Sequence, residues 1–147
     1  MYFHVVLILH IIGASIWAGG HIILLLVFLP KALKEKNFKI IETFEIRFEK
    51  IGIPSLISQI VTGVILAYHY NVNFLTWFSF STPIEKVVSI KLLLLILTLI
   101  LAIHAKFFII PKLNNSNLFN LGIHITLITL TAVSMLIIGT FIRFGGL

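Results

Sequence analysis

Apolar residues form four long stretches along the chain, over about residues 4–29, 52–70, 87–110 and 119–142. Each stretch is close to the roughly 20 residues that an α-helix needs to cross the hydrocarbon core of a bilayer. Polar and charged residues gather between the stretches, where we expect the connections. The pattern predicts an all-α integral membrane protein, a four-helix bundle that forms one domain over residues 1–147.

The composition agrees with this prediction. Of 147 residues, 59% are hydrophobic and only 11% are charged, and the mean hydropathy is +1.13. We expect the first stretch to be retained as a span, because no basic segment precedes it and it is longer than the apolar run of a signal peptide. The absence of cysteine excludes disulfides, thiolate metal sites and covalent c-type haem.

The basic residues predict the orientation. Most of them lie in the 31–50 and 106–118 connections, whereas the 71–86 connection carries only Lys86 and the C-terminus only Arg143. Because lysine and arginine favour the cytoplasmic side, we expect both termini outside, N-out and C-out, in a multi-pass protein of the bacterial inner (cytoplasmic) membrane. The basic connections account for the net charge of +6. We therefore expect membrane lipid as a partner and no nucleic acid.

The 31–50 connection also contains phenylalanine and isoleucine among its charges. We therefore expect it to be a cytoplasmic extension of the first helix or an interfacial helix. Pro54 is expected in the first turn of the second span and Pro83 just before the third, where proline is tolerated.

Six histidines lie in or at the ends of the predicted spans. Ionisable residues within spans are rare and are functional candidates. A rise of about 1.5 Å per residue puts His10 and His69 at an outer level and His21, His104 and His124 at an inner level. His10 and His21 differ by a rise of about 16 Å and, after full turns, by a rotation of about 20°, so they share one face.

Two levels of histidine suit two bis-histidine haem b groups, because neutral imidazole is a good axial ligand. We predict that His10 and His69 bind the outer haem, and that His21 binds the inner haem with His124 or His104. His124 lies on a hydroxyl-bearing stripe and on a neighbouring helix, whereas His104 lies on the diagonal helix, so both stay open. For any single histidine the alternative is a hydrogen bond to a neighbour's backbone or to interfacial water.

Small and aromatic residues share the face of the two histidines in the first span. Gly13, Ala14 and Gly20 would leave space for a porphyrin, and Trp17 would lie along its edge. The alternative for the small residues is that they let two helices approach closely.

Two cations are candidates for the haem propionates. Lys91 lies about two turns inside the third span, and Arg47 lies in the basic 31–50 connection. The alternatives are that Lys91 extends to the outer interface and that Arg47 only adds to the cytoplasmic charge.

Four segments carry a family resemblance: "LHIIGASIWAGG", "RFEKIGIPSL", the Thr-Gly pair at 62–63, and "IKLLLLILTLILAIH". Together they resemble the CopD-like group of small four-helix membrane proteins, which includes copper-resistance D domains and the short haem-binding protoporphyrinogen oxidases of bacteria. The resemblance spans most of the chain and implies haem binding. It singles out His10, Trp17, Gly19, Gly20, Arg47, Lys91 and His104.

The chain also departs from this family. Ser89 lies in the region where those oxidases have a histidine, and His21, His69 and His124 are additional to the pattern. We therefore expect a dihaem b-type membrane cytochrome that transfers electrons across the bilayer between a quinol and a partner protein or small oxidant. The alternatives are a haem-dependent enzyme like the protoporphyrinogen oxidases, and a CopD-like copper transport protein. We expect a homodimer, because four short helices cover two porphyrins only thinly.

Overall fold

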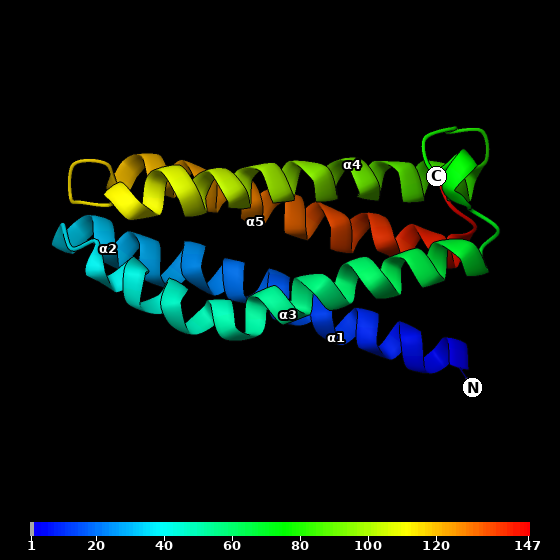
Figure 1. Ribbon diagram of the computed structural model, residues 1–147, viewed down its shortest axis with the longest axis horizontal. Helices are drawn as coiled ribbons and strands as arrows, with labels where there is room; N and C mark the ends of the chain where they lie inside the picture. Colours follow the sequence, from blue (N-terminus) through cyan, green and yellow to red (C-terminus); the bar gives the residue numbers. More distant parts are fainter. Residues whose placement is uncertain (1) are drawn as a thin grey trace.

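The computed structural model describes residues 2–147, and over these residues the chain is all-α (Figure 1). Within them, four helical segments are long and apolar enough to cross a membrane. They cover Tyr2–Glu35, Lys39–His69, Pro83–Lys112 and Leu118–Phe144. The prediction of a multi-pass, four-helix membrane protein is confirmed.

The helices and shorter helical turns follow one another with brief connections. Their order is α1 (Tyr2–Ile23), the π-helical turn η1 (Leu24–Phe28), α2 (Leu29–Glu35), α3 (Lys39–His69), the 3₁₀ turn η2 (Phe74–Thr76), α4 (Pro83–His104), the π-helical turn η3 (Ala105–Ile109), the 3₁₀ turn η4 (Ile110–Lys112), α5 (Leu118–Thr140) and the 3₁₀ turn η5 (Phe141–Phe144).

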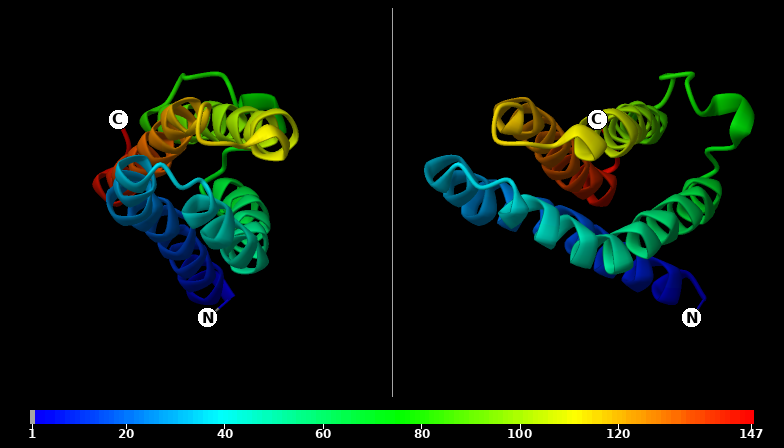
Figure 2. Two further views of the ribbon diagram at one scale, coloured as in Figure 1. Left: turned by 90° about the vertical axis from the view of Figure 1, so that its left-hand side faces the viewer. Right: turned by 60° about the vertical axis from the view of Figure 1, so that its left-hand side comes forward.

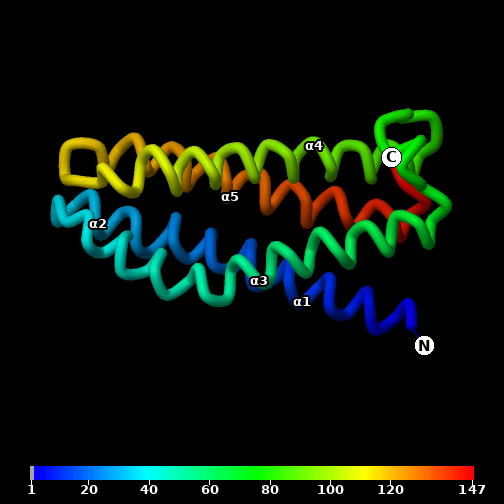
Figure 3. Tube along the Cα trace, in the orientation of Figure 1, coloured from blue at the N-terminus to red at the C-terminus, as the bar shows by residue number. Residues whose placement is uncertain are grey.

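The four segments form two antiparallel pairs. α1 packs on α3, α4 packs on α5, and contacts between α1 and α5 join the pairs, whereas α3 and α4 share few direct contacts (Figure 2). Both ends of the chain lie at the same end of the bundle, as an even number of spans requires (Figure 3). The first half of α1 diverges from α4 and α5 toward this end (Figures 1 and 2).

The opposite end, which carries the basic connections, is the more closely packed. An apolar cluster there joins the first segment to α3 and α5. Beside it, an ion pair between Glu49 and Lys106 links α3 to η3. The buried members of the cluster are Leu24, Leu29, Ala32, Ile41, Leu118, Leu121 and Ile125.

The start of α4 follows from its sequence. The hydroxyl of Thr82 accepts a hydrogen bond from the Glu85 backbone N–H, and the Glu85 carboxylate accepts one from the Thr82 backbone N–H. This capping box satisfies donors that a helix N-terminus leaves free. Pro83 occupies the first turn, where its missing N–H costs nothing.

The 31–50 connection differs in part from the prediction. Residues 29–35 extend the first helix as expected, but α3 already begins at Lys39. Pro54 therefore lies inside α3 and not in its first turn, which corrects the prediction. Proline removes a backbone hydrogen bond and clashes with the preceding turn. α3 bends near its middle, where such a kink is expected (Figure 1).

Substitution of Gly20 tests the packing of α1 on α3. A Cβ atom at Gly20 would lie 2.1 Å from Cε2 of Phe48, whose ring is stacked on Phe44 and meets His21 edge-on. We expect Gly20→Ala to destabilise the protein by about 1–3 kcal/mol, the usual cost of overpacking. Gly19→Ala is the matched control, because a Cβ there meets nothing within 4 Å and alanine favours the helix. Thermal unfolding of both variants in one detergent measures the effect, and equal midpoints would contradict it.

Candidate functional site

His10 lies half-buried on α1, against α3. Its Nδ1 is 2.8 Å from the hydroxyl oxygen of Thr62. When that hydroxyl donates its single proton to the carbonyl oxygen of Ser58, it accepts a hydrogen bond from the imidazole. In this arrangement His10 carries its proton on Nδ1, and the lone pair is on Nε2. Among the residues that the structure describes, this Nε2 has no hydrogen-bond partner.

Other residues of α3 hold His10 in this position. The side-chain amide of Gln59 donates a hydrogen bond to the His10 carbonyl oxygen. Gly63 leaves room for the ring, because a Cβ there would lie 3.4 Å from Cε1 of His10. Sequence reasoning missed Gln59, although it is a polar residue inside an apolar span and lies one turn before Thr62.

Lys91 lies inside α4 and is half-buried. Its ammonium lies against α5, where a Cβ at Gly139 would be 3.3 Å from Nζ. The hydrogen bond between Thr98 and Thr131 sets the register of α4 and α5 and puts Lys91 and Gly139 at nearly the same level. The Lys91 side chain thus lies across α5 near the last turn of that helix. Within residues 2–147, Lys91 has no carboxylate partner.

His21 is enclosed by aromatic rings and is only 7% exposed. Its Nδ1–H donates a 2.8 Å hydrogen bond to the carbonyl oxygen of Trp17, so its lone pair is also on Nε2. The imidazole lies 4.5 Å from the Trp17 ring and 5.6 Å from the Phe48 ring, between centroids. Thr129 of α5 donates to the His21 carbonyl oxygen at 3.2 Å. In the part of the chain that the structure describes, the buried indole N–H of Trp17 has no partner.

The small residues near these histidines face α3. A Cβ at Gly13 would lie 2.8 Å from Nε2 of Gln59, and one at Gly20 would overlap Phe48. The space predicted for a porphyrin at these glycines is therefore filled by α3, and the glycines instead permit close helix packing, the alternative that the sequence left open. Ala14 is half-buried.

The structure does not bring His10 and His69 together. His69 is exposed at the end of α3, where its ring stacks on Phe3 at a centroid distance of 4.1 Å. It lies seven residues beyond Thr62, a rise of about 10 Å. Arg47 is exposed on the first part of α3, near the basic end.

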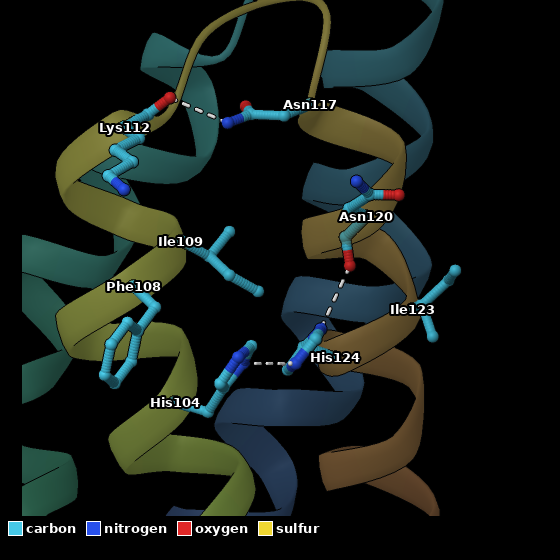
Figure 4. A pocket seen from close by; sticks show the side chains of 8 residues that line it. All are labelled: His104, Phe108, Ile109, Lys112, Asn117, Asn120, Ile123 and His124. Atoms are coloured by element: carbon cyan, nitrogen blue, oxygen red, sulfur yellow. Dashed lines mark hydrogen bonds between the residues drawn. The ribbon is translucent and has the colours of Figure 1, made fainter.

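His104 and His124 contact each other and not His21. Nδ1 of His104 is 3.0 Å from Nε2 of His124, and the two rings are stacked. Nδ1–H of His124 donates to the carbonyl oxygen of Asn120 at 3.1 Å. The pair lines a groove of about 330 Å³ between the ends of α4 and α5 (Figure 4). The sequence put both residues at the inner level but paired only one of them, either His124 or His104, with His21.

Comparison of the chain with protein-family models, with curated proteins and with solved structures gave no match. The resemblance to the CopD-like group stays a prediction from the sequence.

Nuclear magnetic resonance of ¹⁵N-histidine-labelled protein tests the hydrogen bonding of His10. We expect a protonated Nδ1 and an unprotonated Nε2, because the Thr62 hydroxyl proton is directed to the Ser58 carbonyl. The nearly isosteric variant Thr62→Val removes the acceptor and should shift the His10 signals or mix its tautomers. His21, whose acceptor is a backbone carbonyl, should keep its signals in this variant. An unchanged His10 in Thr62→Val would show that the Thr62 hydroxyl does not fix the tautomer.

Proposed function

We propose that the protein is a dihaem b-type membrane cytochrome in which Nε2 of His10 and Nε2 of His21 bind the two irons. The observation that supports this is the hydrogen bonding of both imidazoles, which donate from Nδ1 and keep a lone pair on Nε2. Histidines that bind metals have this arrangement, because a hydrogen bond at the other nitrogen fixes the tautomer and the ring orientation. Bound haem would supply a one-electron redox centre at each level.

The surroundings of His10 fit the outer haem. Its Nε2 has no partner among the described residues, so a ligand bond replaces no existing contact. The ammonium of Lys91 is a positive charge without a carboxylate partner inside residues 2–147, and a haem propionate would neutralise it. Lys91 would thereby orient the group and would favour its reduced state.

The surroundings of His21 supply suitable chemistry for the inner haem. However, the imidazole is only 7% exposed and Phe48 fills the space beside Gly20, so the Phe48 ring would have to turn aside for the group to enter. The rings of Trp17 and Phe48 give it an apolar environment, which limits water and tunes the redox potential of a bound group. The indole N–H of Trp17, unpartnered within the described chain, is a free donor beside it. Along α1 the two imidazoles are about 16 Å apart, so electrons would cross the bilayer in two steps.

The remaining parts of the proposal rest on the sequence. The electron donor would be a quinol dissolved in the bilayer, and the acceptor a partner protein or a small oxidant. The protein would act in the bacterial inner membrane as a homodimer. We leave His69 out of the ligand set, because it lies against Phe3 two turns from Thr62.

The haem content of the purified protein tests the proposal. A pyridine haemochrome assay should find about two haems b per wild-type chain. His10→Ala and His21→Ala should each lose one haem and retain different spectral components, because each removes the donor at one level. His4→Ala is the matched control, since His4 is exposed on the same helix, and it should keep both haems. A wild-type protein without haem would refute the function, and loss of the same component in both variants would refute the two-level assignment.

Lys91 should set the potential of the outer haem. Lys91→Met removes a positive charge from a side chain of similar length, so the reduced state of the outer haem loses stabilisation. We expect the midpoint potential of this haem to fall while the other midpoint stays. Lys91→Arg keeps the charge and should stay near wild type. A spectroelectrochemical redox titration measures both potentials. Two unchanged midpoints in Lys91→Met would show that the charge of Lys91 acts on neither haem.

A further inference from the structure

We propose that His104 and His124 bind one divalent transition-metal ion, such as Zn²⁺, at a site separate from the haem ligands. His104 is the last residue of α4, and His124 lies in the second turn of α5. His21 takes no part, because it contacts neither His104 nor His124. The proposal therefore does not depend on haem binding at α1.

The distance between the two imidazole nitrogens suits a shared ion. Nδ1 of His104 and Nε2 of His124 are 3.0 Å apart. Two nitrogens at about 2.0–2.1 Å from one ion, with an angle of roughly 90–110° between them, lie about 2.9–3.4 Å apart. Imidazole is a preferred ligand of zinc, nickel and copper. An ion can thus take the place of the shared proton at this separation, with each ring turning its lone pair from the other nitrogen toward the ion.

The surrounding residues hold both rings in place. The hydrogen bond from Nδ1 of His124 to the Asn120 carbonyl leaves Nε2 as the ligand atom. The ring of His104 stacks on Phe108 at a centroid distance of 5.4 Å. His104 now donates its Nδ1 proton to His124, and on metal binding this proton would move to Nε2, so the imidazole stays neutral. The π-helical turn η3 begins at the next residue, and such turns recur at functional sites.

The groove leaves room for the rest of the coordination shell. Figure 4 shows the two imidazoles side by side, with Asn120 and Asn117 following along α5 and Lys112 across from them. Within residues 2–147, no group of three or more histidine, cysteine, aspartate or glutamate side chains could hold a metal. Water would therefore occupy the remaining positions, for which the groove of about 330 Å³ has space.

Equilibrium dialysis of the purified protein against buffered Zn²⁺, followed by metal analysis, tests the site. The protein should carry an affinity tag without histidine. We expect one Zn²⁺ per chain in the wild type and binding weaker by about tenfold or more in His104→Gln and in His124→Gln. His104 is exposed, so its replacement should leave the fold intact. His69→Gln is the matched control, because it removes an exposed histidine at the other end of the bundle, and it should bind Zn²⁺ as the wild type does.

Zinc binding that is unchanged in both groove variants, or lost equally in His69→Gln, would overturn the proposal. X-ray absorption at the zinc edge should show two imidazole ligands and otherwise oxygen, and a shell without imidazole would also overturn it. The haem content of the same samples separates the two proposals. Haem that is lost in His124→Gln while zinc is retained would assign His124 to haem, whereas zinc binding by a protein without haem would refute only the cytochrome.

Discussion

The close approach of α1 and α3 is the contact on which the rest of the structure depends. Lipid tails are as apolar as leucine, so helices in a bilayer associate through packing and polar contacts and not through the hydrophobic effect. Gly13 and Gly20 let Gln59 and Phe48 of α3 reach the backbone of α1. The same contact brings the Thr62 hydroxyl to Nδ1 of His10. One interface therefore holds the helix pair together and fixes the histidine tautomer.

The polar groups of the other helix pair serve a similar purpose. Thr98 and Thr131 share a hydrogen bond at 3.0 Å between α4 and α5, and His104 and His124 share another nearer the basic end. Thr129 connects the two pairs through the carbonyl oxygen of His21. Because α1 contacts both α3 and α5, α3 and α4 are left with few direct contacts. The interior histidines thus lie on helices that are fixed by their own partners and not by a uniformly packed core.

The sequence was a good guide to the spans but not to the partners of the histidines. The apolar stretches predicted the four spans, whereas His69, expected at the level of His10, lies about 10 Å beyond Thr62. Register between helices depends on side chains that meet across an interface, such as Gln59 and the His10 carbonyl, and periodicity within one helix contains no such information. For this reason the sequence could not show that His69 meets Phe3, or that His104 meets His124. Pro54 was misplaced because α3 begins well before its apolar stretch.

The helices contain polar groups that are satisfied within the protein and others that are not. Hydroxyls in the spans, such as those of Ser55, Thr62 and Thr98, donate to carbonyl oxygens of their own helices, which is the low-energy solution in a bilayer. In contrast, the indole N–H of Trp17 is buried without a partner among the described residues, and the Lys91 ammonium has no counter-ion among them. Each such group costs free energy in an apolar medium unless a ligand satisfies it. Trp17 lies beside His21, so one of these costs falls next to an imidazole with a free lone pair. The indole N–H of Trp77, in the connection before α4, is also buried without a partner among the described residues.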